Sequence, residues 1–264
     1  MAAELMITLT SDFGLKDPYV AEMKGVILTI NPKATLIDIT HQIEKFNIRA
    51  AAFVLASAAP YFPDGTVHVA IVDPGVGTDR RSIIIKTKKD YFVGPDNGIL
   101  ILASRNQTIQ HIYKLTNPKY MLPKISETFH GRDIFAPAAA YLDGGVNPED
   151  FGPEIDDPVT PKFAKVKISE GSLTGEVLDV DGFGNLITNI NKKDAAGMEG
   201  KTLNIELACA TLKIPFGKTY ASAKPKEPIL LIGSHGFLEL ALNQASAAEK
   251  FHEKAGDKIK VSVA

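Results

Sequence analysis

The first half of the chain alternates between short β-branched apolar runs and longer stretches in which apolar residues recur every three or four positions. The short runs predict strands, and the longer stretches predict helices. The predicted strands lie at 6–13, 35–40, 66–73, 82–87, 91–95 and 109–115, and the predicted helices at 18–32, 47–62, 98–105 and 132–145. This order predicts an α/β unit with a mostly parallel sheet covered by helices on both faces.

The pattern changes near residue 160, after a stretch that holds Pro153, Pro158 and Pro161. Beyond it the apolar runs are short, closely spaced and separated by Gly or Asn turns, which is typical of a small β-barrel or sandwich. Only residues 241–251 have helical propensity there, and a loop fits them as well. We therefore predict two domains, an N-terminal α/β domain over residues 1–160 and a C-terminal all-β barrel domain over residues 161–264.

Composition narrows the functional classes. The 264 residues carry a net charge of −2, which argues against a general nucleic-acid or acidic-membrane binder. The N-terminus lacks a basic region followed by an apolar segment, and no apolar run reaches 18 residues, so a cytoplasmic protein is expected. The single cysteine, Cys209, has no partner for an internal disulfide. The alternating run around it predicts a buried or half-buried thiol.

Candidate chemistry gathers where predicted strands end, because ligands of α/β sheets bind beyond the carboxyl ends of the strands. Asp12 ends the first strand, and Asp73 ends the strand at 66–73. Arg80 follows in the same turn, and His130 begins the segment "HGRDIF". Each has a plainer interpretation, since Asp12 and Asp73 also suit turns or helix caps. Arg81 fits a solvated surface, and a lone histidine is often structural.

Several common motifs are excluded. Gly75–Arg80 shares only two glycines with a dinucleotide fingerprint and precedes a strand rather than a helix. The six histidines are far apart and have no cysteine partner, so a zinc site has little support.

In the second half, "DVDGFGNLITNI" places Asp181, Phe183 and Asn185 in a glycine-rich turn, which fits either a hairpin loop or a ligand contact. Ser234 and Asn243 are candidates to contact a polar ring edge.

Six segments together resemble one family. "TSDFG", "AIVDPGVGTDRR", "GPDNG", "TFHGRDIFAPAAA", "DGFGNLITNI" and "GSHGFLELA" are similar, in order, to the S-adenosyl-L-methionine (SAM) hydroxide adenosyltransferases, which are related to the fluorinases and chlorinases. The resemblance runs from about Thr8 to Glu249. It implies an α/β domain followed by a β-barrel, and a homotrimer with the ligand between the N-terminal domain of one subunit and the C-terminal domain of its neighbour.

The resemblance also implies a reaction, the cleavage of SAM by water into adenosine and L-methionine. The family's catalytic trio falls on Asp73, Arg80 and His130. A fluorinase has tyrosine at the Asp73 position and a halide-holding threonine at the Val76 position, and this chain departs from both. Halide transfer and a non-catalytic sensor of adenosine or SAM are the alternatives.

The implied binding residues divide by the part of the substrate. Asp12 falls on the ribose-binding position, Asp181 and Asn185 on the methionine-binding positions, and Phe183 on the position that stacks on adenine. The segments that contact adenine match Ser234, His235, Leu242, Asn243 and Gln244. The family's reaction needs no cofactor and no metal, and neither nucleic acid nor membrane is an expected partner.

Overall fold

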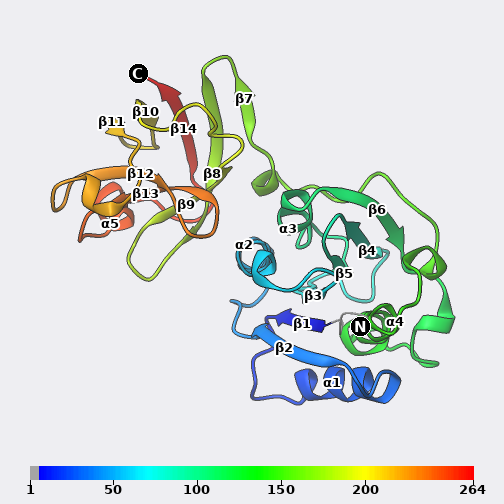
Figure 1. The fold of residues 1–264 in the computed structure, drawn as a ribbon. Coiled ribbons are helices and arrows are strands. Elements are labelled where there is room, and N and C mark those ends of the chain that lie inside the picture. Colours follow the sequence, from blue (N-terminus) through cyan, green and yellow to red (C-terminus); the bar gives the residue numbers. More distant parts are fainter. Residues whose placement is uncertain (1–5) are drawn as a thin grey trace. The chain divides into compact units, whose positions relative to one another are not determined.

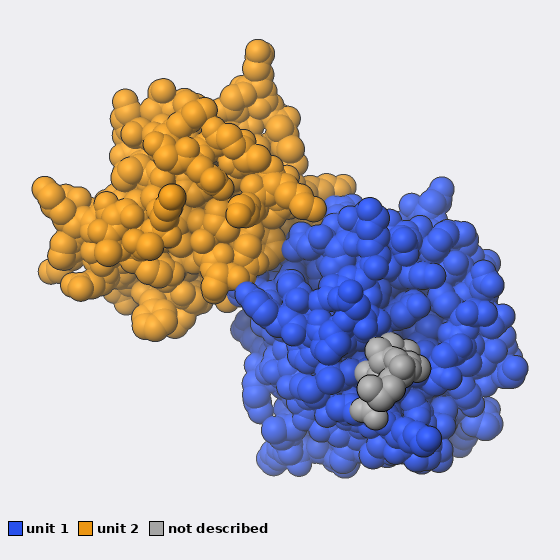
Figure 2. All heavy atoms as spheres, in the orientation of Figure 1, with its two compact units in different colours: residues 1–160 blue, residues 161–264 orange. Residues whose placement is uncertain are grey.

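The computed structural model describes residues 6–264 and divides the chain into two compact units, Met1–Thr160 and Pro161–Ala264. Figure 1 shows the elements of each unit, and Figure 2 colours the two units separately. In the described part of the chain, no helix combines the length and the apolar character needed to cross a membrane.

Unit 1 is built on a six-stranded sheet with the order β2-β1-β3-β5-β4-β6. Its strands are β1 (Met6–Ser11), β2 (Thr35–Thr40), β3 (Val67–Ile71), β4 (Ser82–Thr87), β5 (Tyr91–Pro95) and β6 (Ile109–Lys114). The four strands β2, β1, β3 and β5 run parallel, so their carboxyl ends meet at one edge of the sheet. β4 runs antiparallel to both β5 and β6. A three-residue turn, 88–90, joins β4 to its neighbour β5, and a ten-residue connection, 72–81, joins β3 to β4.

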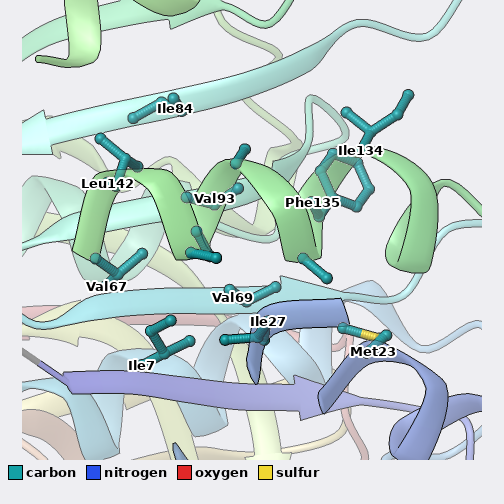
Figure 3. Close-up of a cluster of buried hydrophobic side chains, with 14 of the residues drawn as sticks. Ile7, Met23, Ile27, Val67, Val69, Ile84, Val93, Ile134, Phe135 and Leu142 are labelled. Carbon is teal, nitrogen blue, oxygen red and sulfur yellow. The ribbon is translucent and has the colours of Figure 1, made fainter. Parts of the chain in front are cut away.

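Helices cover both faces of this sheet, as predicted. They are α1 (Tyr19–Ile30), α2 (Ile48–Ala58), α3 (Ile101–Asn106) and α4 (Ala136–Asp143). α1 and α4 pack against each other over Ile7, Val67 and Val69, and Figure 3 shows this cluster around Met23, Ile27 and Phe135. Alternate residues such as Thr8 and His68 point to the opposite face, where α2 and α3 contact each other. These layers leave the carboxyl edge of the parallel strands free to carry a site.

Unit 2 is a nearly closed antiparallel sheet with the order β11-β10-β14-β8-β9-β13-β12, and β7 pairs with β8. Its elements are β7 (Lys167–Ser169), β8 (Ser172–Val180), β9 (Leu186–Asn191), β10 (Thr202–Glu206), β11 (Thr211–Pro215), β12 (Pro228–Ile232), β13 (Phe237–Leu242), α5 (Ala247–Phe251) and β14 (Lys258–Val263). A bridge between Phe216 and Leu230 links the two ends of the strand order. The predicted barrel is therefore confirmed.

Two expectations from the sequence are wrong. Cys209 is exposed and precedes β11, because the alternating run is interrupted by a turn in which the Leu207 amide donates to the Ala210 carbonyl. Arg81 is not a solvated surface residue. Its guanidinium binds the buried carboxylate of Asp96 at 2.7 Å and also Asp157 at 2.6 Å. Both partners are distant in sequence, so local pattern did not indicate them.

Candidate active site

A cavity of about 640 Å³ lies in unit 1 at the carboxyl end of β1 and β3. Three of the residues predicted from the sequence, Asp12, Asp73 and His130, line it together. Its other walls are formed by Phe13, Tyr19, Glu22, Lys45, Phe46, Ile71, Val76, Ser126, Thr128, Phe129, Gly131 and Arg132. Parallel strands bring Asp12 and Asp73 to one edge, as the strand-end rule requires.

Asp73 and Arg80 form a two-point ion pair at this cavity. The Arg80 Nε lies 3.1 Å from Asp73 Oδ1, and the Arg80 Nη2 lies 2.5 Å from Asp73 Oδ2. Their side chains are only 8% and 6% exposed, so water screens the pair little. A planar guanidinium that binds both carboxylate oxygens fixes the orientation of the carboxylate as well as its distance.

Arg80 is itself held from three further directions. Its Nη1 donates to Ser82 Oγ at 2.8 Å and to the Arg81 carbonyl at 3.1 Å. The guanidinium carbon lies 5.4 Å from the centre of the Phe135 ring. The side chain thus has few alternative positions, and the charge it places behind Asp73 is fixed before any ligand arrives.

His130 completes the cluster through the same guanidinium. Arg80 Nη2 lies 3.0 Å from His130 Nδ1, and an arginine only donates, so Nδ1 accepts this hydrogen bond. The neutral ring therefore carries its proton on Nε2. The pKa of His130 is lowered, first because the ring is partly buried and second because the positive charge of Arg80 lies beside it. The Nε2–H group of His130 is thus available to donate a hydrogen bond, whereas Nδ1 already accepts one from Arg80.

The turn that carries Asp73 and Arg80 packs directly on the loop before His130. Gly77 has φ 77°, and a Cβ there would collide with the Glu127 carbonyl oxygen. Only glycine fits such an approach without strain. The contact joins two segments that are 50 residues apart, counted from Glu127 to Gly77, and fixes Arg80 relative to His130.

We expect Gly77→Ala to lower the free energy of unfolding by about 3 kcal/mol, since it adds both a steric clash and an unfavourable φ. Urea denaturation measures this change. Gly75→Ala is the matched control, because the nearest atom to its Cβ is 3.5 Å away, and we expect a change within about 0.5 kcal/mol. Equal effects of the two variants would contradict the packing described here.

Asp12 is the second acid of the cavity and is 7% exposed. Its Oδ2 accepts a hydrogen bond from the Phe46 amide at 2.9 Å, and its backbone carbonyl accepts one from the Lys45 ammonium. Phe46 has φ 65°, an unusual conformation for a bulky residue. Phe46 thus combines an unusual backbone conformation with a hydrogen bond to Asp12, and both residues line the cavity.

Sequence reasoning missed part of the cavity wall. Phe13, Tyr19 and Phe129 form an aromatic cluster whose ring centres are 5.1 to 5.8 Å apart. Phe13 and Phe129 adjoin Asp12 and His130 in the quoted motifs, and that adjacency was a usable signal. No sequence signal indicated Lys45 and Phe46, because their position depends on the loop after β2.

Arg132 and Asp133 follow His130 closely in the sequence, and their contacts hold the walls of the cavity in position. Asp133 is fully buried and accepts from the Ser126 amide at 2.8 Å and from Arg132 Nε at 2.7 Å. Burial alone would raise the pKa of Asp133, but these hydrogen bonds outweigh it and the pKa is lowered. Arg132 also binds Glu22 of α1 at 2.8 Å. These contacts tie the loop before His130 to the short π-helical turn Gly131–Phe135 and to α1.

Unit 2 has a separate cavity of about 530 Å³. It is lined by Phe183, Asn185, Tyr220, Leu242, Asn243, Gln244, Ala245 and Ser246. Five of these were predicted as binding residues, and Tyr220, Ala245 and Ser246 were missed. Phe183 is 82% exposed, which leaves its ring open to a flat partner. Asn243 Nδ2 donates to the Ala223 carbonyl at 2.7 Å and so retains its amide oxygen for another contact.

Asp181 closes the glycine-rich loop beside this cavity. Its Oδ1 accepts from the amides of Phe183 and Asn185 at 2.9 Å each, and its Oδ2 accepts from Asn185 Nδ2 at 2.9 Å. The hairpin-loop interpretation therefore describes the local structure. A carboxylate has further lone pairs, so these bonds leave room for a ligand donor.

Ser234 and His235 lie in the turn between β12 and β13 and do not line the cavity of unit 2. His235 Nε2 lies 3.2 Å from the buried carboxylate of Glu239, whose other oxygen accepts from the Tyr220 hydroxyl at 2.8 Å. Burial and the neighbouring Glu239 together raise the pKa of Tyr220 to about 12. The hydroxyl of Tyr220 is thus neutral and points to Glu239.

Among residues 6–264, no group of three or more His, Cys, Asp and Glu side chains has the spacing of a metal site. The cavity of unit 1 offers the Asp73 carboxylate and the neutral His130 imidazole, and the guanidinium of Arg80, which is not part of the lining, binds both of them. An α/β unit that gathers these groups at the carboxyl edge of its parallel strands, followed by an antiparallel barrel, has the layout of an enzyme with a small-molecule site.

Comparison with known proteins identifies the family. The N-terminal domain of the SAM hydroxide adenosyltransferases matches residues 7–152, and their C-terminal domain matches residues 175–260. The chain belongs to this family. It is 39% identical to a protein of Thermus thermophilus named (R)-S-adenosyl-L-methionine hydrolase, over 93% of this chain and 95% of the relative.

Other relatives and a solved structure also match nearly the whole chain. A protein of Methanocaldococcus jannaschii with the same hydrolase name is 39% identical over 97% of this chain and 95% of its own. A fluorinase of an Actinoplanes species is 29% identical over 98% of each chain. The crystal structure of an uncharacterized conserved protein from Thermotoga maritima has a TM-score of 0.83 and 38% identity, covering 97% of this chain and 100% of that one.

Proposed function

We propose that the protein hydrolyses S-adenosyl-L-methionine to adenosine and L-methionine. The observation that carries this proposal is the Asp73 carboxylate on the cavity wall, fixed by its ion pair with Arg80, in a chain whose 36–39% identical relatives are named SAM hydrolases. The fixed carboxylate is the group that a reaction with water requires.

The reaction is a displacement at the ribose C5′. The water oxygen forms a bond to C5′ while the C5′–sulfur bond breaks. The electron pair of the breaking bond stays on sulfur and neutralises the sulfonium. The leaving group is then a neutral thioether, so its departure needs no acid. The surplus proton of water passes to Asp73 and then to solvent, and neither a metal nor a redox cofactor takes part.

Asp73 is the base in this scheme, because its orientation is fixed and it borders the cavity. Arg80 positions the carboxylate and places positive charge where the water becomes anionic. His130 orients the water or the ribose edge through its Nε2 proton. It is not the base, since Nδ1 is occupied by Arg80.

The remaining binding roles follow the family resemblance. Asp12 accepts the ribose hydroxyls, since a carboxylate has two oxygens to match a diol. Phe183 stacks on adenine, and Asn185 with Asp181 contacts the methionine part. Ser234, His235 and the segment Leu242–Gln244 contact adenine. The protein acts in the cytoplasm.

Activity with chloride or fluoride tests the alternative of halide transfer. Val76 lines the cavity where fluorinases have their halide-holding threonine, so an apolar side chain replaces a donor there. We expect adenosine and methionine in equal amounts, and no 5′-halo-adenosine at high halide concentration. Stoichiometric binding without turnover would identify a sensor instead, and 5′-halo-adenosine would identify a halogenase.

The activity should persist at acidic pH. The pKa of His130 is lowered, so its neutral form and the Arg80 contact survive as pH falls through the ordinary histidine pKa of 6.5. We expect kcat/KM to fall only below pH 6.5. In the pH profile of His130→Gln, this acidic fall in kcat/KM should be absent. An apparent pKa at or above 6.5 that vanishes in His130→Gln would contradict this assignment.

We further propose a homotrimer in which unit 1 of one subunit and unit 2 of its neighbour share each substrate. Subunits with Asp73→Asn and subunits with Asn185→Ala should each be inactive alone. After equal amounts are mixed and exchange subunits, we expect about a quarter of wild-type activity, because one neighbouring pair in four combines an intact unit 1 with an intact unit 2. Light scattering should give three times the 28.5 kDa chain mass. A monomeric mass, or no recovery after subunit exchange, would overturn this assembly.

A further inference from the structure

A buried histidine outside the cavity contacts the strand end that carries Asp12. His41 follows β2, and Ser11 is the last residue of the neighbouring parallel strand β1. The His41 Nδ1 lies 2.7 Å from Ser11 Oγ, and the two residues are 4% and 1% exposed. Neither residue lines the cavity, and the proposed reaction uses neither of them.

Ser11 Oγ links His41 to the turn that holds Asp12. Ser11 Oγ accepts from the Phe13 amide at 3.3 Å, and it shares a second hydrogen bond with His41 Nδ1, in which a hydroxyl can act as donor or acceptor. The other ring nitrogen of His41, Nε2, faces Asp38. This Nε2 is 3.1 Å from Asp38 Oδ1 but is not aligned as a hydrogen bond, so their contact is electrostatic. The other oxygen of Asp38 binds Lys24 Nζ at 2.6 Å.

Backbone hydrogen bonds reinforce the same connection. The Gly14 amide donates to the His41 carbonyl at 2.7 Å, and the Ile43 amide donates to the Ser11 carbonyl at 3.4 Å. The turn with Asp12 at its centre is therefore held by His41 through both side chain and backbone. On its far side, Asp12 is held by the Phe46 amide.

We propose that His41 is a positioning residue for the ribose of the substrate, acting through Ser11 on the carboxylate of Asp12. The inference rests on the proposed function, because it takes Asp12 to be the ribose ligand. A ribose contact is made equally in the bound substrate and in the transition state, so loosening it raises KM and leaves kcat unchanged.

Two substitutions of one residue separate this role from a general structural one. In His41→Asn the side-chain amide takes the place of Nδ1 and can still form the hydrogen bond to Ser11 Oγ, whereas in His41→Gln the longer side chain takes the place of Nε2 and loses that bond. We expect His41→Gln and Ser11→Ala to raise KM for SAM and Kd for adenosine about tenfold, the value of one lost hydrogen bond. His41→Asn should keep both constants within about twofold of wild type.

His111→Gln is the matched control, since His111 lies on β6 at the opposite edge of the same sheet. Thermal melting checks that each variant folds. If His41→Gln does not fold, Ser11→Ala takes its place as the test variant. A fall in kcat with unchanged KM, equal effects of the Asn and Gln variants, or no shift in either variant would overturn the role of His41. A wild-type protein that neither hydrolyses SAM nor binds adenosine would overturn the proposed function itself.

Discussion

Asp73→Asn is expected to lower kcat for SAM hydrolysis by about 10³-fold, the effect of removing a positioned general base. An amide has the shape of the carboxylate but cannot take the proton of the attacking water. It also loses one of the two acceptors that bind Arg80. Steady-state assays of adenosine release measure the loss, and circular dichroism confirms that the variant folds.

Asp79→Asn is the control for this variant. Asp79 is an exposed carboxylate in the same turn. The Asp79→Asn substitution therefore removes the same charge from the same segment without changing the cavity. We expect its kcat to stay within about twofold of wild type. Comparable activity of Asp73→Asn and Asp79→Asn would exclude Asp73 as the base.

Arg80→Lys is expected to have the second largest effect, a fall in kcat of about 10²-fold. Lysine keeps the positive charge but presents a single ammonium in place of a planar fork. It cannot bind both oxygens of Asp73 and also reach Ser82, the Arg81 carbonyl and His130. The carboxylate then gains freedom to rotate, and the positive charge shifts away from the attacking water.

Arg105→Lys provides the comparison, because the exposed Arg105 belongs to the same unit and lies outside the cavity lining. Its kinetics should match those of wild type. If Arg80→Lys were fully active, charge alone would suffice, and the two-point geometry would have no catalytic meaning.

The sequence was sufficient to predict the positions of Asp12 and Asp73. A β-branched run that ends in an acid marks the end of a parallel strand, and parallel strands end at one edge of the sheet. That rule brought the two acids together without any knowledge of tertiary contacts. The trio itself depended on the family resemblance, because no local pattern states that Arg80 faces Asp73 or that His130 lies beside both.

The contacts that support the site were not predictable in this way. Arg81 binds Asp96 and Asp157, Gly77 approaches Glu127, and His41 contacts Ser11. Each pairs segments that are 15 or more residues apart, and periodicity carries no information on such pairs. A glycine with positive φ or a buried histidine is recognised only when its neighbours are placed.

Unit 2 shows the same limit. The glycine-rich loop at Asp181 was recognised as a turn, and the structure shows that its carboxylate organises that turn. Tyr220 was not foreseen, because it comes from a connection between β11 and β12 rather than from a strand end. A cavity wall made from connections has no signature in strand or helix periodicity.

The central claim is that Asp73 directs water to C5′ of the ribose, and oxygen labelling tests it most directly. SAM is incubated with the wild-type protein in ¹⁸O-enriched water, and the adenosine is analysed by mass spectrometry. We expect one ¹⁸O atom in the 5′-hydroxyl of adenosine, and release of adenosine about 10³-fold slower with Asp73→Asn. Unlabelled adenosine, or labelled adenosine formed as fast by Asp73→Asn, would contradict it.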